Sequence, residues 1–265
     1  MSRFLILLLG FVILISSAGI VSAGDGQECR LITDDFPPYA SYNDGRLSGI
    51  AVAIVKELMK STGCSGKIET LPWKRAIAYS RISKAMLFPF TRRPYREKEY
   101  KWIGPILKDR FVFAVCNEDT SNYTHIDDFR DLEVGVVIGT PTEHRLQELA
   151  FNHIQSVAAE KQNAMKMLGA HRIDAWYSTE RILYHTIKSL GIDPKEIRIA
   201  LQDIDVEMYI AASKSIPDEL VLKWQDSLDA MKDSGRYQAI LEKNSREWDS
   251  SHYTNGFRHN PKNVP

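Results

Sequence analysis

The sequence predicts an α/β fold in two lobes, each with a parallel-dominated sheet covered by helices. Short apolar runs alternate with amphipathic runs between residues 30 and 82, and the connections are short. The same alternation starts again after Pro105. Strands and helices that alternate in this way favour parallel sheets, and the restart indicates a second unit of the same kind.

The first unit begins with a strand over residues 30–33 and has a second strand over residues 67–71. Between them, Asn43–Gly45 indicates a turn. A helix follows, because apolar residues recur at helical spacing and Gly63 comes after them: Ala51, Ile54, Val55, Leu58 and Met59. Pro72 opens another helix at Trp73, since the start of a helix tolerates proline.

The second unit contains a buried strand over residues 133–138 that leads through Gly139 into a helix. Thr140 is the expected N-cap and Pro141 the first helical residue, with Glu143 reaching back. Such a start directs backbone N–H groups outward, which suits an anion. An ordinary capped helix explains the pattern equally well.

Residues 172–177 are typical of a further strand, and a helix starts near Pro217 with Leu220, Trp224, Leu228 and Met231 on one face. Apolar runs at 111–116 and 207–212 predict two strands that cross between the lobes. We therefore expect lobe 1 to comprise residues 24–113 and 212–248, and lobe 2 residues 114–211 with the hinge strands. Residues 249–265 are polar and lack periodicity. A ligand is expected in the cleft, at the carboxyl ends of the strands.

Residues 1–23 are typical of a secretory signal peptide. Arg3 precedes an apolar run from Phe4 to about Ile15, and small residues lead to Ala23. The alternative is an N-terminal membrane anchor, although the apolar run is short for a membrane span. We expect a mature protein that begins near Gly24 and is located outside the cytoplasm.

The overall charge excludes a general polyanion binder. The chain has 34 basic and 34 acidic residues, and loss of residues 1–23 removes only Arg3, which gives a net charge of −1. Positive charge is instead concentrated in residues 91–105, where it forms either a solvated loop or an anion site: Arg92, Arg93, Arg96, Lys98 and Lys101. We expect the two lysines to face solvent and to pair with Glu97 and Glu99.

The three cysteines fit an exported protein. Cys29 and Cys64 each precede a predicted strand, and in parallel neighbouring strands their thiols would lie at the same end. This predicts a disulfide between them. Cys116 lies in an apolar run and is expected to be a buried thiol. No ligand-spaced Cys and His set indicates a metal, and no motif indicates a cofactor.

Short motifs in a fixed order resemble those of the family 3 extracellular solute-binding proteins, the periplasmic receptors of polar amino acid ABC importers. They extend over nearly all of the chain after residue 24: Asp35 to Tyr39, Gly45–Gly49, Pro72–Ala76, Arg93–Glu97 with Trp102 and Pro105, Val134–Val136 with Gly139 and Thr140, Ile173–Ala175, Lys214 and Ser234–Tyr237. The resemblance implies a type II periplasmic-binding-protein fold, with a hinged cleft and no catalysis.

The resemblance also implies the site residues. Arg96 falls where the family has the arginine that holds the ligand carboxylate, and a guanidinium grips a carboxylate with two parallel hydrogen bonds. Thr91 and Arg93 fall where the family has hydroxyl-bearing residues. Gly139 and Thr140 would supply opposing donors, and the remaining candidates are Tyr39, Trp73, Thr142 and Thr179. For Trp73, packing in the core is the alternative.

Three positions depart from the family pattern. Thr179 stands where the family has an aspartate that holds the ligand ammonium, and Lys84 and Ala53 replace two further aspartates. The carboxylate half of the site is therefore expected and the ammonium half is not. The ligand would be an amino acid held differently or a carboxylate without an α-amino group.

The expected function is that of a monomeric periplasmic binding protein that delivers a small carboxylate to an ABC permease. A same-fold sensor input protein and an enzyme that resembles cyclohexadienyl dehydratases are the alternatives, since fold does not fix function.

Overall fold

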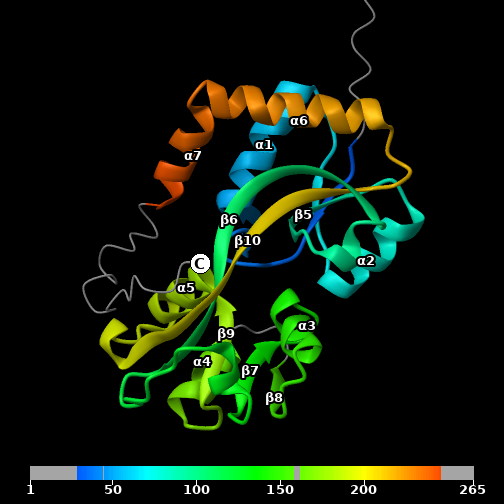
Figure 1. The fold of residues 1–265 in the computed structure, drawn as a ribbon. Helices are drawn as coiled ribbons and strands as arrows, with labels where there is room; N and C mark the ends of the chain where they lie inside the picture. Colours follow the sequence, from blue (N-terminus) through cyan, green and yellow to red (C-terminus); the bar gives the residue numbers. More distant parts are fainter. Residues whose placement is uncertain (1–28, 44, 158–161, 246–265) are drawn as a thin grey trace, which may run out of the picture.

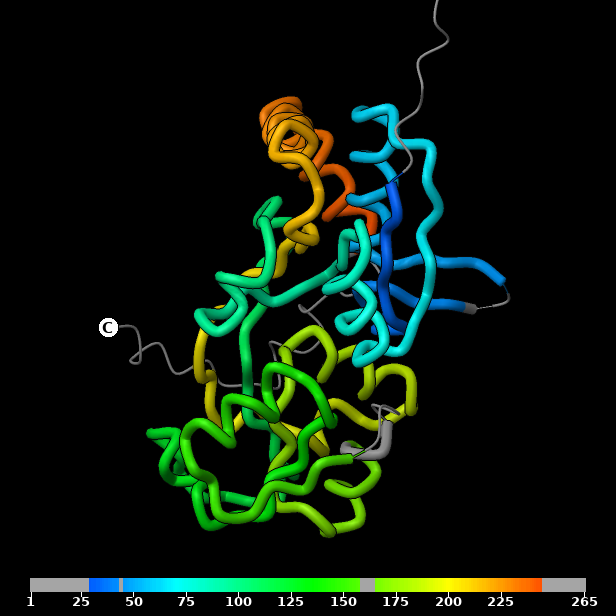
Figure 2. Tube along the Cα trace, turned by 90° about the vertical axis from the view of Figure 1, so that its right-hand side faces the viewer, coloured from blue at the N-terminus to red at the C-terminus, as the bar shows by residue number. Residues whose placement is uncertain are grey.

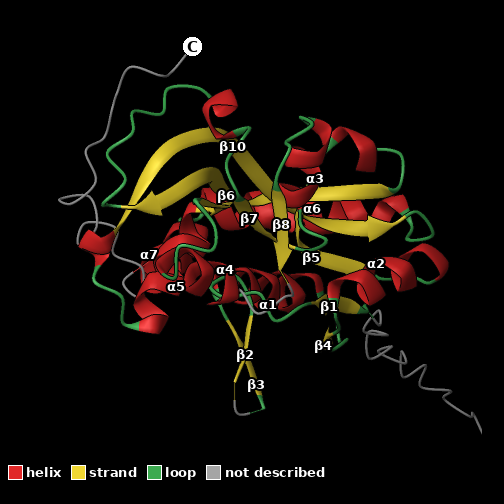
Figure 3. Ribbon diagram, turned by 90° about the horizontal axis from the view of Figure 1, so that it is seen from below, coloured by secondary structure: helices red, strands yellow, loops and turns green. Residues whose placement is uncertain are grey.

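The computed structural model of the chain describes residues 29–43, 45–157 and 162–245. A mixed sheet runs through the molecule in the strand order β4-β1-β5-β10-β6-β9-β7-β8. Its strands are β1 (Leu31–Thr33), β4 (Ile68–Thr70), β5 (Met86–Thr91), β6 (Tyr100–Cys116), β7 (Val134–Val137), β8 (Ile154–Val157), β9 (Ala175–Thr179) and β10 (Ile197–Ser213). A separate hairpin, β2 (Ser41–Asn43) and β3 (Arg46–Ser48), projects from the body (Figure 3).

The helices lie around this sheet (Figure 1). They are α1 (Ile50–Thr62), α2 (Trp73–Ile82), α3 (Pro141–Glu148), α4 (Gln162–Gly169), α5 (Glu180–Leu190), α6 (Asp218–Asp233) and α7 (Arg236–Ser245), with the short 3-10 turns η1 (Pro94–Arg96), η2 (Ile126–Phe129) and η3 (Pro194–Glu196). None of these described helices is both long and apolar enough to cross a membrane. The predicted signal peptide and polar tail fall outside the described residues.

The long strands β6 and β10 divide the molecule into two halves, one above the other in Figure 2. In the first half, β1 pairs in parallel with β4 and β5, and β5 pairs with the end of β10 from Met208 to Ala212. In the second half, β7 pairs in parallel with β8 and β9, and β9 pairs with β6 from Phe111 to Ala114. Because β6 and β10 also pair with each other, the two predicted sheets are the two ends of one sheet. The predicted α/β class is confirmed.

Local sequence signals account for several helix ends. Gly63 adopts a left-handed conformation after α1, as only glycine does without strain, and its N–H donates to the Lys60 carbonyl. In α6 the buried side chains are the four predicted from the apolar spacing, Leu220, Trp224, Leu228 and Met231. The helix α7 follows directly and was not predicted, because the segment has no strong apolar periodicity.

The structure places the thiols of Cys29 and Cys64 in hydrogen-bonding contact at one end of the paired strands β1 and β4. Among the described residues no disulfide is formed, so the predicted bond stays a prediction. The hydrogen bond from Cys29 lowers the pKa of the Cys64 thiol to about 7 and raises that of Cys29. Cys116 lies apart, half-buried, with its Sγ 3.5 Å from the Leu168 carbonyl oxygen.

Candidate ligand-binding site

A cavity of about 430 Å³ lies between the two halves of the molecule. Its wall combines the loop after β1, the start of α2 and the end of β5 with the turn between β7 and α3. The lining is mainly apolar, with a few charged groups: Thr33, Asp34, Asp35, Phe36, Pro72, Trp73, Lys74, Pro89, Thr91, Arg96, Val137, Ile138, Gly139, Thr140, Pro141 and Met208. An apolar cleft with a few converging polar groups is the usual form of a small-molecule site.

Arg96 is the buried cation of this cavity and is only 7% exposed. Its Nη1 donates to the Thr91 carbonyl at 2.9 Å, and its Cζ lies 4.0 Å from the centre of the Phe90 ring. The acidic residues next to it in sequence, Glu97 and Glu99, pair instead with Arg92 and Arg81. Burial lowers the pKa of Arg96. Since buried charges are normally paired, this guanidinium is suited to an incoming anion.

A smaller cavity of about 40 Å³ adjoins the first on the side of the second half. The two share several wall residues, among them Thr91 and Thr140. The additional wall is rich in hydroxyl groups: Thr142, Tyr177, Ser178 and Thr179. Thr179 also caps α5, since its side chain accepts from the N–H of Ile182. Its side chain is therefore fixed at the end of β9.

The start of α3 has the predicted cap. Thr140 accepts a hydrogen bond from the N–H of Glu143. The Glu143 carboxylate reaches back one residue further than the expected Thr140 N–H and accepts from the N–H of Gly139 at 2.5 Å and from the Ser156 hydroxyl at 2.5 Å. The Thr140 N–H donates to the Val137 carbonyl. The Gly139 N–H, which the sequence predicts as a ligand donor, is thus already bonded to a carboxylate.

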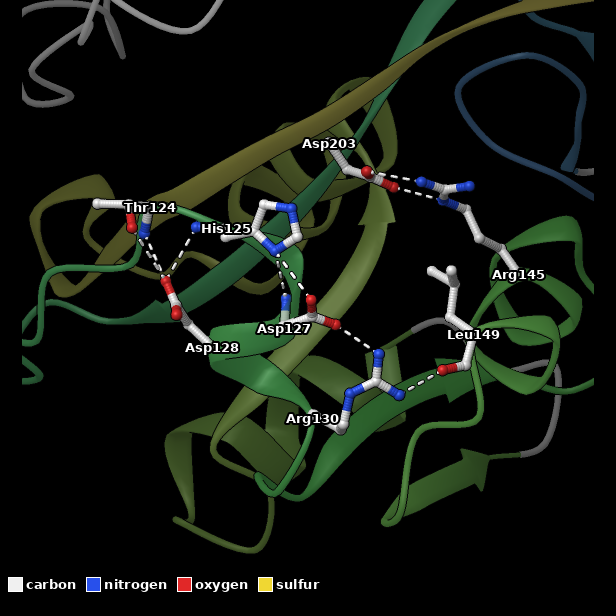
Figure 4. A network of polar contacts seen from close by, with 8 residues as sticks. All are labelled: Thr124, His125, Asp127, Asp128, Arg130, Arg145, Leu149 and Asp203. Carbon is white, nitrogen blue, oxygen red and sulfur yellow. Dashed lines mark hydrogen bonds and ion pairs between the residues drawn. The ribbon is translucent and has the colours of Figure 1, made fainter.

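The two halves also touch beside the larger cavity. The rings of Tyr95 in η1 and His144 in α3 stack with centroids 4.2 Å apart. Behind them Arg145 forms a two-point ion pair with the buried Asp203 (Figure 4). Arg93 lies close to Arg145, and burial followed by this like charge lowers the pKa of Arg93. Because Asp203 balances the charge of Arg145, the positive charge at this contact is that of Arg93.

A buried polar cluster joins the two halves behind the cavities. The Tyr39 hydroxyl from the first half contacts the carboxylate of Asp109 on β6 and lies 2.8 Å from the Thr179 hydroxyl. Asp109 also accepts from the N–H of Arg110 at 2.7 Å, and Nε of Arg181 is 3.8 Å away. Burial raises the pKa of Asp109 to about 6. The hydrogen bonds of this cluster connect the two halves of the molecule.

We expect the Asp109→Asn variant to gain stability relative to the unchanged protein as pH rises. A carboxyl whose folded pKa exceeds its unfolded value stabilises the fold while protonated, and this contribution is lost as pH rises through the folded pKa. Between pH 3.8 and about 6, the unchanged protein should lose about 3 kcal/mol relative to the variant. Urea unfolding at pH values from 4 to 8 measures the difference.

The exposed Asp205, which pairs with Arg110, supplies the control. The Asp205→Asn variant should follow the pH profile of the unchanged protein. Parallel profiles for the Asp109→Asn variant and the unchanged protein would show that Asp109 titrates normally.

The structure brings together most of the residues proposed for the site from the sequence. Arg96, Thr91, Trp73, Gly139 and Thr140 line the larger cavity, and Thr142 and Thr179 line the smaller one. Two candidates lie elsewhere. Tyr39 is fully buried and binds Asp109 instead of lining a cavity, and Arg93 packs over the Phe111 ring beside the smaller cavity.

Other lining residues escaped the sequence reasoning. Asp34, Asp35 and Phe36 follow β1, and their place after a strand would have been the available signal. Pro89 and Met208 lie within buried strands and carry no such signal. The expected pairs of Lys98 and Lys101 with Glu97 and Glu99 are wrong. Lys101 pairs with Asp218 at 2.6 Å, since β6 carries it toward α6.

Comparison with known proteins places the chain in a family. The family model of the bacterial extracellular solute-binding proteins, family 3, matches residues 30–247. No protein among the curated sequences matches the chain. Since the family model covers most of the sequence, the chain belongs to the family 3 extracellular solute-binding proteins.

Solved structures of the same fold include amino-acid-binding proteins and a sensor domain of a histidine kinase. The arginine-, lysine- and histidine-binding protein ArtJ of Geobacillus stearothermophilus has a TM-score of 0.68 at 19% identity, over 82% of this chain and 94% of that one. A histidine kinase sensor domain similar to periplasmic binding proteins has a TM-score of 0.73 at 16% identity, over 82% and 95%. An ancestral amino acid-binding protein described as a precursor of cyclohexadienyl dehydratase has a TM-score of 0.69 at 19% identity, over 82% and 94%. At these identities the likeness establishes the fold.

Proposed function

We propose that this protein is a periplasmic solute-binding protein that captures a small carboxylate-bearing solute, an amino acid or a related organic acid, between its two halves. It then delivers the solute to the membrane permease of an ABC importer. The protein works as a monomer without a cofactor, and residues 1–23 direct its export. Membership of the extracellular solute-binding family supports this role.

The observation that carries the proposal is the buried guanidinium of Arg96 on the wall of a cavity between the halves. No acidic side chain of the described residues forms an ion pair with Arg96, and a carboxylate would supply that counter-charge through two charge-assisted hydrogen bonds. The apolar lining would take the body of the solute. We further propose that the two halves act as the predicted lobes and close around the solute by hinge motion of β6 and β10, as binding proteins of two domains do.

A thermal-shift screen of the purified protein tests the proposal. The panel contains amino acids, keto acids, dicarboxylates and short peptides. A ligand that binds only the native state raises stability with the logarithm of its excess over Kd, so we expect one class of carboxylates to raise the melting temperature. Recovery of the unchanged ligand by mass spectrometry separates a binding protein from an enzyme. A panel without any shift would count against the proposal.

A further inference from the structure

The walls of the two cavities restrict which carboxylate fits. We propose that the ligand is an apolar carboxylic acid whose α-substituent carries no charge (hydroxyl, oxo or hydrogen) rather than an α-amino acid, and that Thr179 sets this preference. This inference rests on the proposed function and names the substrate class of the same site.

The position of the α-substituent follows from Arg96. A carboxylate at Arg96 lies beside Thr91, because Arg96 donates to the Thr91 carbonyl. Thr91 lines both cavities. The α-carbon is one bond from the carboxylate, so its substituent lies within reach of both cavities. We place the substituent in the smaller cavity, of about 40 Å³, and the rest of the molecule in the larger one, of about 430 Å³.

The smaller cavity offers hydroxyl groups and no carboxylate among its described lining residues. The carboxylates behind its wall already have partners. Asp109 binds the Tyr39 hydroxyl and faces Arg181, while Asp203 binds the Tyr177 hydroxyl and forms the ion pair with Arg145.

An ammonium in this cavity would therefore be buried without a counter-charge, which is costly. The Arg93 guanidinium, which packs over the Phe111 ring of this wall, adds positive charge on the same side. A hydroxyl substituent can donate to the lone pairs that the wall hydroxyls keep, and an oxo or hydrogen substituent carries no charge that must be balanced.

The two carboxylates that line the larger cavity accept hydrogen bonds from backbone N–H groups of the first half. Asp34 accepts from the N–H groups of Trp73 and Asp35, at 2.9 and 2.8 Å, and Asp35 accepts from the N–H of Tyr42 at 3.1 Å. Lys74 lines the same cavity. The remaining wall is apolar and suits an aliphatic or aromatic body: Phe36, Trp73, Pro89, Ile138 and Met208.

Isothermal titration with compounds that differ only at the α-carbon tests the inference. Leucine is compared with 2-hydroxy-4-methylpentanoate, 4-methyl-2-oxopentanoate and 4-methylpentanoate, and phenylalanine with phenyllactate and phenylpyruvate. In at least one of the two series, we expect an acid with an uncharged α-substituent to bind at least about a hundredfold more tightly than the corresponding amino acid.

Any other result of these titrations overturns the inference. If the amino acid of a series binds as tightly as its uncharged analogues, the proposed function stands and the ligand class is wrong. The same holds if only polar amino acids or dicarboxylates of the wider panel bind. If the Asp35→Asn variant then loses the amino acid, Asp35 holds the ammonium. If no carboxylate binds, the inference and the proposed function both fail.

A matched pair of variants tests Thr179 itself. Thr179→Asp and Thr179→Asn can both cap α5, and only the first adds a charge to the smaller cavity. The aspartate should shift the preference at least about tenfold toward the amino acid, while the asparagine should leave the ranking unchanged. Identical rankings in two folded variants would show that Thr179 does not face the α-substituent. If the aspartate variant does not fold, the compound series still decides the ligand class.

Discussion

Replacement of Arg96 by glutamine is expected to abolish ligand binding and to leave the empty protein folded. Removal of one partner of a buried, hydrogen-bonded charge pair costs about 2–5 kcal/mol of binding free energy, which corresponds to a loss of roughly thirtyfold to several thousandfold in affinity. Burial lowers the pKa of Arg96, so the loss of its contacts with the Thr91 carbonyl and the Phe90 ring is offset by removal of a buried charge. The melting temperature of the empty variant should therefore change little.

Arg92 provides the matched control, because it lies on the same loop but is exposed and pairs with Glu97. The Arg92→Gln variant should bind the ligand as the unchanged protein does. Titration calorimetry and thermal melting of both variants give the comparison. A large drop in the melting temperature of the empty Arg96→Gln protein, with binding retained, would assign Arg96 to the fold and not to the ligand.

The second large effect is expected from Cys29 and Cys64. In an oxidising compartment, we expect their contacting thiols to form a disulfide, and the lowered pKa of Cys64, about 7, gives the thiolate that disulfide exchange needs. For a loop of the size between these residues, the bond should add about 4 kcal/mol to the free energy of unfolding, because it restricts the unfolded chain. Urea unfolding with and without reductant measures this difference.

Thiol counting establishes whether the bond exists. Alkylation of the denatured protein should modify only Cys116 before reduction and all three cysteines after it. A Cys64→Ser variant should unfold at the same urea concentration with and without reductant. Three reactive thiols in the exported, unreduced protein would exclude the disulfide.

Features that depend on a few neighbouring residues could be predicted from the sequence. Gly63 ends α1 and Thr140 caps α3, because glycine conformation and side-chain capping act within one turn. The buried face of α6 follows from apolar spacing alone. The proximity of Cys29 and Cys64 could be predicted because strands that alternate with helices pair in parallel.

Features that depend on how strands far apart in the sequence pair with one another could not be predicted. Tyr39 was expected in the cleft, but its partners Asp109 and Thr179 come from β6 and β9, which are far away in the sequence. The joining of two sheets into one required knowledge that β6 and β10 pair along their length. Arg96 was identified through its place in the family pattern, whereas its burial and the hydroxyl-lined cavity beside it emerge only when the two halves are assembled.

The paired strands β6 and β10 have a mechanical consequence. Their hydrogen bonds run from Tyr100 opposite Ser213 to Cys116 opposite Ile197, so neither strand can slide along the other without breaking many bonds at once. The ribbon is stiff to stretching and shear, and it is soft only to bending across its plane. The ladder shifts register at three places, between Ile199 and Leu201, between Gln202 and Asp205, and between Met208 and Ile210. If the two halves close as proposed, bending of the paired strands at these interruptions, and not sliding, would be the motion that brings them together.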